Sequence, residues 1–92
     1  MHYVYVIKSL LKNWIYIGSS SDLRKRIVEH NAGKVKSTKG YRPLKLLYYE
    51  AYFHKTDALK REIELKKYGQ QKEMLFRRIE NSLKHTQSGP VV

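Results

Sequence analysis

Two short runs of aromatic and β-branched residues stand close together near the start of this 92-residue chain. They are HYVYVIK over 2–8 and WIYIG over 14–18. Residues of this kind favour extended backbone, so each run predicts a β-strand. Residues 9–13 are the only connection, and a connection this short joins antiparallel neighbours. Residues 1–18 are therefore expected to form a β-hairpin on which the rest of the chain must pack.

One helix and one more strand are predicted after the hairpin. Ser20 or Ser21 is a suitable N-cap, and residues 22–32 are expected to form a helix. This helix stops at Gly33, because helix C-termini favour glycine. The next strand signal is LKLLYYEAYF over 44–53, a largely apolar run that indicates a buried strand.

Two further helices follow that strand. The first is expected to begin at Thr56 or Asp57 and to end near Tyr68, and the second to cover about 71–84. Their predicted apolar positions are Ala58, Leu59, Ile63 and Leu65 in the first, and Met74, Leu75, Ile79 and Leu83 in the second. Each helix thus has an apolar face that can cover a sheet.

Together these elements predict an α+β fold with one three-stranded antiparallel sheet flanked by helices, in the order β-β-α-β-α-α. The length fits a single domain. This domain is expected over 1–84, and the polar sequence over 85–92 predicts a flexible C-terminal tail.

The charge balance limits the partners of the chain. Lys and Arg number 19 against 8 Asp and Glu, a net charge of +11, which favours a polyanionic partner such as nucleic acid over a membrane surface. The absence of cysteine excludes a disulfide framework and a thiol nucleophile. The four histidines have no zinc-ligand spacing. No apolar run approaches the ~18 residues of a membrane span, and no signal peptide is recognisable, so we expect a cytoplasmic protein.

Part of this charge is concentrated in one window. Between Glu29 and Glu50 there is no acidic residue, and the five cations there are Lys34, Lys36, Lys39, Arg42 and Lys45. A loop with this composition suits a phosphate backbone, with Tyr41 available to stack on a base. The alternative interpretation is a basic loop that serves only solubility.

Two tyrosines mark a possible site on the hairpin. Tyr5 and Tyr16 are expected on neighbouring strands. Gly18 follows Tyr16 at the exit of its strand, where a missing side chain lets a ligand or another backbone approach.

The predicted helices add charged residues beside their apolar stripes. At ~100° per residue, Arg26 and His30 fall on the flank of the stripe formed by Leu23 and Ile27. The same count on the next helix places Glu62 at the edge of the stripe that contains Leu59. Side chains in such positions need a charged partner or line a cleft.

Tyrosine, arginine, histidine and one carboxylate next to a basic surface suit phosphodiester cleavage. Glu62 alone could hold a hydrated Mg²⁺ or Mn²⁺, because such ions keep several waters. Arg26 could offset transition-state charge and lower the pKa of a tyrosine, which is otherwise a poor base. The alternative is that Tyr5 and Tyr16 are core aromatics and that Arg26 and Glu62 form a structural ion pair.

The stretch YVY over 3–5 followed by YIG over 16–18, with Arg26, His30 and Glu62 at their spacings, resembles the GIY-YIG nuclease superfamily. The likeness covers about 2–68 and is greatest to its small stand-alone bacterial members. It implies a compact domain on a three-stranded antiparallel sheet and metal-dependent hydrolysis of nucleic acid, with DNA as the expected substrate.

The resemblance also implies roles for single residues. Tyr5 and Tyr16 match the two motif tyrosines, one of which activates the attacking water. Arg26 matches the arginine at the scissile phosphate, and His30 matches a supporting histidine. Glu62 matches the carboxylate that holds the metal. The sixth match is Gly18, the glycine that keeps the strand end open.

Tyr3 replaces the glycine of the first motif, which is a common variation in this subgroup. Two other departures, together with the basic window over 34–45, leave a second function open. Ser19 stands where several members have a lysine beside the active-site tyrosine. An asparagine beyond the metal-ligand helix has no clear equivalent. The alternative is a catalytically weak nucleic-acid-binding module that acts with a partner in DNA repair or recombination. In either case specificity is expected to be low, or to come from DNA structure or a protein partner.

Overall fold

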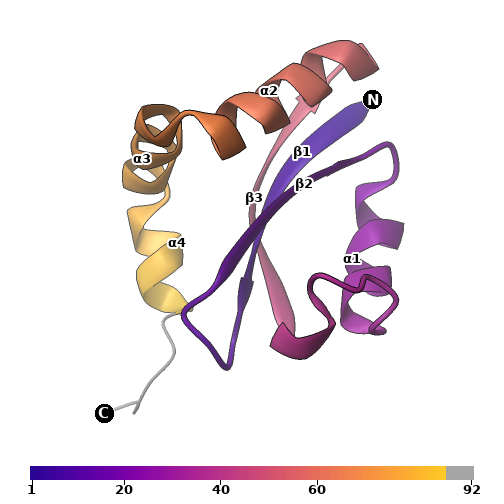
Figure 1. Ribbon diagram of the computed structural model, residues 1–92, viewed down its shortest axis with the longest axis vertical. Coiled ribbons are helices and arrows are strands. Elements are labelled where there is room, and N and C mark those ends of the chain that lie inside the picture. Colours follow the sequence, from indigo (N-terminus) through magenta and orange to yellow (C-terminus); the bar gives the residue numbers. More distant parts are fainter. Residues whose placement is uncertain (87–92) are drawn as a thin grey trace.

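The hairpin forms as predicted, and the third strand pairs with its first strand. The computed structural model describes residues 1–86 (Figure 1). Its elements are β1 (His2–Ser9), β2 (Ile15–Ser20), α1 (Leu23–Asn31), a short 3-10 helix η1 (Lys39–Tyr41), β3 (Leu44–Tyr52), α2 (Lys55–Lys67), α3 (Gly69–Arg78) and α4 (Glu80–His85). The sheet is antiparallel with the order β2-β1-β3. The predicted α+β fold is therefore confirmed.

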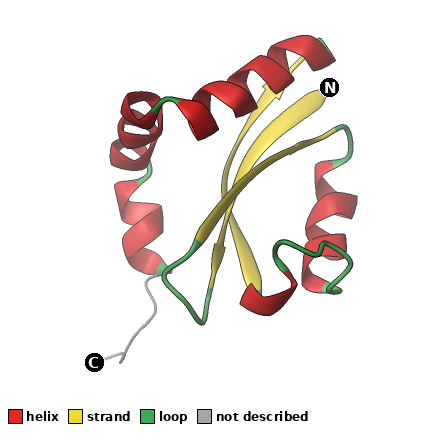
Figure 2. Cartoon of the chain, viewed as in Figure 1, coloured by secondary structure: helices red, strands yellow, loops and turns green. Residues whose placement is uncertain are grey.

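The helices cover the two faces of the sheet separately (Figure 2). Helix α1 lies on one face, and α2, α3 and α4 lie on the other (Figure 1). Side chains alternate along β1, so Val4 and Val6 join the core cluster beneath α2 and α3, while Tyr5 and Ile7 join the cluster beneath α1. Within residues 1–86, no helix is long and apolar enough to cross a membrane.

The first helix is capped differently from the prediction. Its N-cap is Asp22, whose carboxylate accepts from the Lys25 backbone N–H at 3.1 Å, and neither serine has this role. Ser20 instead supports the turn by accepting from the Asp22 N–H at 3.1 Å. A carboxylate is the stronger acceptor at the positive end of a helix. The predicted stop is confirmed, since Gly33 has φ 78, which glycine adopts without strain.

The second helix begins earlier and buries a different stripe than predicted. It starts at Lys55, and the His54 imidazole accepts from the Thr56 N–H as its N-cap. Ala58 and Leu65 are buried, but two other predicted core positions, Leu59 and Ile63, are 37% and 58% exposed. The helix is rotated relative to the predicted stripe because partly buried polar side chains are satisfied at its sheet-facing surface.

One of those polar groups joins α2 to β3. Arg61 Nε donates to Glu50 Oε1 at 3.0 Å, and the Tyr48 hydroxyl donates to Glu50 Oε2 at 2.6 Å. Burial alone would raise the pKa of Glu50, but Arg61 and the tyrosine hydroxyls hold it below its usual range. This network fixes the position of α2 against the sheet.

The third predicted helix is divided in two. Ile79 leaves helical geometry with φ −107 and ψ 25, and it separates α3 from α4. Of the predicted apolar positions Leu75 and Ile79 are buried and Leu83 packs against the core, whereas Met74 is exposed. Of the expected tail, His85 ends α4, and residues 87–92 lie outside the part of the chain that the structure describes.

Candidate active site

A cleft runs along the end of β2, between α1 and the first half of α2. Its lining includes Ser19, Lys25, Arg26, Glu29, Lys55 and Leu59. Three of these side chains are cationic, so an anion entering the cleft meets positive charge from both helices. Sequence reasoning missed Lys25 and Lys55, because nothing along the chain shows that these two helices border the same cleft.

Tyr5 lies below this cleft and is completely buried. Its hydroxyl is 2.7 Å from His30 Nε2, and its ring is 6.4 Å from the ring of Tyr16. A side-chain carbon at Gly18 would lie 2.6 Å from the Tyr5 hydroxyl oxygen and 2.9 Å from a Tyr16 ring carbon. The structure thus assigns Gly18 the role of making room for the two tyrosines, and the space beside it is not open to a ligand.

His30 is the only fully buried residue of α1, and its hydrogen bonds define its tautomer. The Thr38 hydroxyl donates to the Val35 carbonyl at 3.3 Å, so its oxygen accepts from His30 Nδ1–H at 2.8 Å. His30 Nε2 is then unprotonated and accepts from the Tyr5 hydroxyl. A chain of hydrogen bonds therefore joins β1, α1 and the basic loop.

Both ends of the Tyr5–His30 hydrogen bond are uncharged. Burial, aided by the Arg26 guanidinium and opposed by Glu29, lowers the pKa of His30 to about 4. Burial also raises the pKa of Tyr5 to about 12, although Arg26 acts in the opposite direction. Arg26 therefore lowers the pKa of Tyr5 as predicted, but burial outweighs it and the net pKa is raised. This raised pKa favours the protonated hydroxyl of Tyr5 at neutral pH.

Tyr16 is the tyrosine that solvent can reach. It is half-buried, and its hydroxyl has no hydrogen-bond partner among residues 1–86, yet no buried side-chain oxygen there lacks a partner. The hydroxyl must therefore contact solvent. The ring lies edge-on to His30 at 5.3 Å, and the ammonium of Lys66 lies 5.5 Å from the ring centre.

Arg26 is half-buried at the wall of the cleft. Its guanidinium pairs with Glu29 Oε1 at 3.3 Å, one turn along α1. The proximity of the Tyr5 hydroxyl raises the pKa of Arg26 above its usual range. The ion pair between Arg26 and Glu62, considered above as a purely structural alternative, does not form. Arg26 is thus held between Glu29 and Tyr5 while it lines the cleft.

Glu62 reaches the site from the opposite side of β2. Its Oε1 accepts from the Ser19 hydroxyl at 2.7 Å, and its Oε2 accepts from Lys66 Nζ at 2.7 Å. The carboxylate is only 18% exposed, whereas the Lys66 side chain is 47% exposed. Several family members have a lysine at the position of Ser19. Here Lys66 brings a cation close to Tyr16 and Glu62 instead. Its spacing of four residues from Glu62 on a helix is the signal that could have identified it.

Glu62 is the single carboxylate that could hold a metal here. Residues 1–86 contain no group of three or more His, Asp or Glu side chains that could form a metal cage. The donor set still fits a hydrated Mg²⁺ or Mn²⁺, because such ions need only one or two carboxylates. The partly exposed Lys66 ammonium would have to release the Glu62 oxygen to which it now donates.

The basic loop lies beyond the buried Thr38. All five of its predicted phosphate-contacting cations are exposed: Lys34, Lys36, Lys39, Arg42 and Lys45. Tyr41 is not free to stack on a base with both faces, because its ring is stacked on Trp14 at 3.7 Å and 9°. The loop is thus anchored by Thr38 and Tyr41 while its charged side chains point to solvent.

A sequence model of the GIY-YIG catalytic domain matches residues 1–86. The chain belongs to the GIY-YIG family. The two motif tyrosines, the arginine, the histidine and the glutamate meet around the end of β2, so the motifs that suggested this nuclease family also converge in space.

Relatives of this GIY-YIG domain are small bacterial proteins. It is 42% identical to the UPF0213 protein of Staphylococcus saprophyticus, covering 79% of this chain and 89% of that one. It is 40% identical, with the same coverage, to the UPF0213 protein of Staphylococcus haemolyticus. The solution NMR structure of the UPF0213 protein of Bacillus halodurans is 33% identical, covers 97% of this chain and 87% of that chain, and has a TM-score of 0.43.

The close packing of Gly18 against the two tyrosines predicts that one added methyl group reduces the stability of the protein. Gly18→Ala should reduce the free energy of unfolding by about 1–3 kcal/mol, because the rings of Tyr5 and Tyr16 must move. Gly69→Ala is the matched control, since a side-chain carbon there meets nothing within 4 Å. Urea denaturation measures both. Equal stabilities of the two variants would contradict the packing role of Gly18.

The buried neutral His30 predicts a pH-dependent stability. The unfolded chain binds this proton near pH 6.5 and the folded chain only near pH 4, so acid favours unfolding. The contribution is complete above about pH 6.5 and is lost as the pH falls towards 4, by about 2–3 kcal/mol. Urea unfolding of the natural protein and of His30→Gln between these values measures it. The variant should show the shallower slope, and parallel slopes would disprove the assignment.

Proposed function

We propose that this protein is a metal-dependent endonuclease that hydrolyses DNA phosphodiester bonds, with low sequence specificity or with selectivity for DNA structure. One observation carries the proposal. Arg26 and Glu62, a guanidinium and a carboxylate from helices on opposite faces of the sheet, both lie at the end of β2, because Arg26 lines the cleft beside Ser19 and the Ser19 hydroxyl donates to Glu62. Tyr16, whose hydroxyl reaches solvent, is on the same strand. A core packed only for stability has no need of this arrangement.

In this proposal the buried Tyr5 and His30 position the site, and the more accessible Arg26 and Tyr16 contact the phosphate and the attacking water. The Tyr5 hydroxyl, held by neutral His30, supports the Arg26 guanidinium from below. Arg26 then binds the scissile phosphate and offsets the charge that develops on it. Tyr16 accepts a hydrogen bond from the attacking water and orients it, since its hydroxyl is the one open to solvent.

Glu62 would hold Mg²⁺ or Mn²⁺ through the oxygen that Lys66 now occupies. The ion supplies Lewis acidity to the phosphate when it is bound. Ser19 keeps the second carboxylate oxygen in place. Lys66, once released, remains beside Tyr16 as a cation for the substrate.

DNA would be held along the cleft and the basic loop. Lys25 and Lys55 line the cleft, and the five loop cations lie beyond it. These contacts go to phosphates and carry no sequence information. Specificity would come from DNA structure or from a protein partner, and the substrate would place the protein in the cytoplasm, at the nucleoid.

Removal of one carboxylate tests the activity. Glu62→Gln should reduce the rate of Mn²⁺-dependent DNA cleavage by about 100-fold or more, because the metal ligand is lost. Glu64→Gln is the matched control on the same helix, where the carboxylate pairs with Arg61 away from the cleft. Cleavage of flap, branched, duplex and single-stranded DNA, with and without chelator, measures both variants.

The same experiment separates the second candidate function. If the natural protein binds these DNAs but cuts none of them with either ion, it is a binding module that acts with a partner. The observation that favours this candidate is that both oxygens of Glu62 are already hydrogen-bonded. Full activity of Glu62→Gln would refute the metal-ligand role.

The proposed role of the loop predicts a change in salt dependence. Lys36→Gln should reduce the slope of log K against log salt for DNA binding by about one, because one phosphate contact is lost. Lys84→Gln, whose lysine pairs with Glu80 on α4, is the control and should leave the slope unchanged. Fluorescence anisotropy over a salt series measures both. Unchanged slopes for both variants would indicate a loop that serves only solubility.

A further inference from the structure

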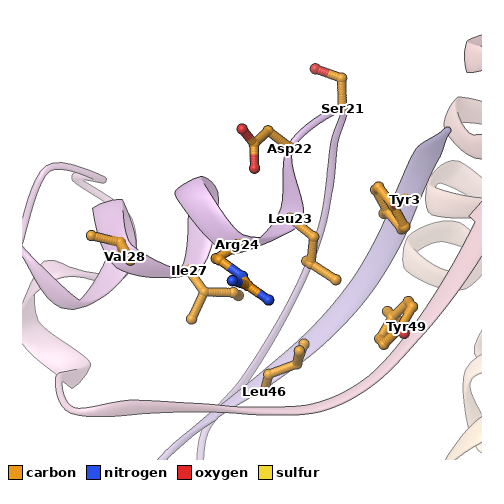
Figure 3. Close-up of a pocket in the computed structure, with 9 residues that line it drawn as sticks. All are labelled: Tyr3, Ser21, Asp22, Leu23, Arg24, Ile27, Val28, Leu46 and Tyr49. Atoms are coloured by element: carbon orange, nitrogen blue, oxygen red, sulfur yellow. The ribbon is translucent and has the colours of Figure 1, made fainter.

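A second hollow lies on the other flank of α1, between this helix and strands β1 and β3 (Figure 3). Helix α1 leaves this part of the sheet uncovered. The hollow measures about 600 Å³. Leu23, Ile27 and Leu46 line its apolar side, and Tyr3 and Tyr49 stand at the strands (Figure 3). The proposed catalytic roles use none of these residues.

The walls of this groove suit a flat aromatic ring. Tyr49 is 52% exposed, although its side chain is on a sheet face that packs under a helix elsewhere. Its ring meets that of Tyr3 edge-to-face, with centres 5.9 Å apart and planes at 69°. This pair leaves an open ring face at the groove, and Arg24 contributes a guanidinium at the rim (Figure 3). Aromatic rings and arginine together are the usual platform for an unstacked base.

The groove is continuous with the cleft of the active site. Ser21 and Asp22, at the start of α1, line both hollows. Two neighbouring residues of β1 also connect the hollows, because His2 lines the cleft and Tyr3 lines the groove. A strand leaving the cleft therefore enters the groove by passing the start of α1.

The register of the sheet gives the separation between the groove and Tyr5. Tyr49 is the partner of Tyr5 across β1 and β3, and Tyr5 is the partner of Gly18 on β2. Adjacent strands lie ~4.8 Å apart, so the groove starts one strand spacing from the tyrosine that supports Arg26. This separation is within the reach of a neighbouring nucleotide.

We propose that the groove between Tyr3, Tyr49 and α1 binds one unpaired nucleobase of the strand whose phosphate lies in the cleft. The inference rests on the proposed function and names its substrate class: DNA with an unpaired nucleotide beside the scissile bond, as in single strands, flaps and branches. A base within an intact duplex is stacked on both faces and cannot enter. The net charge of +11 and the shared lining favour a nucleic acid strand over an apolar peptide.

Binding without cleavage provides the test. The full chain is titrated in chelator with short DNA that carries 2-aminopurine, either as a single strand or within a duplex. Fluorescence of the probe should be quenched in the single strand, because the base stacks on tyrosine, and little changed in the duplex. Tyr49→Ala should weaken single-strand binding by roughly 5- to 100-fold and duplex binding by less than about 2-fold.

Two controls keep the result interpretable. Tyr49→Phe retains the ring and should restore both binding and quenching. Tyr68→Ala removes a tyrosine that is 54% exposed outside the groove and should change neither. If Tyr49→Ala does not fold by circular dichroism, Tyr49→Leu replaces it, because leucine keeps apolar bulk without a stacking face.

The outcomes distinguish the groove from the nuclease. Equal losses on single strands and duplexes, or no loss on either, would overturn the base subsite, and binding of an apolar peptide that DNA does not displace would do the same. Discrimination by Tyr49 in a protein that cuts nothing with Mn²⁺ would leave the subsite standing and the proposed nuclease activity disproved. Metal-dependent cutting, without a Tyr49-dependent difference between single strands and duplexes, would support the nuclease activity and disprove the base subsite.

Discussion

The buried hydrogen bond between Tyr5 and His30 is the contact on which the site depends. It joins the central strand to α1, and through Thr38 it also holds the basic loop. Two polar side chains without solvent are stable only when each satisfies the other, and burial keeps both uncharged. The rings fit together because Gly18 has no side chain. The half-buried residues of the candidate site therefore lie on a buried and closely packed base.

The second half of the site depends on the opposite face of the sheet. Glu62 belongs to α2, which packs against Val4 and Val6 rather than against the tyrosines. The network of Arg61 with Glu50 sets the rotation of this helix, and Ser19 at the edge strand then receives the Glu62 carboxylate. The site is assembled around the edge of β2, where the two faces of the sheet meet. Side chains of helices on opposite faces of the sheet, Arg26 and Glu62, therefore lie near one edge strand.

Sequence reasoning predicted the hairpin correctly because its signals are local, and it proposed site residues that the structure brings close together. Aromatic and β-branched runs, and the one-turn spacing of Arg26 and His30, need no tertiary information. It failed where competing local choices were close in energy. Asp22 caps α1 in place of a serine, and the buried stripe of α2 contains Ala58 and Leu65 instead of Leu59 and Ile63. Glu62 was nevertheless proposed, because it lies near the border of both the predicted and the observed stripe.

The sequence by itself determined the strands, the net charge of the chain and the types of residue available for chemistry, because these follow from propensity and composition. The tertiary structure decided which of those residues are buried and which are accessible. It made Tyr5 a support and Tyr16 the accessible hydroxyl, since burial differs between adjacent strands of one sheet. It supplied Lys66 as the cation beside Tyr16, and it opened the groove at Tyr49. Such assignments depend on which faces meet, and only packing of the whole chain settles that.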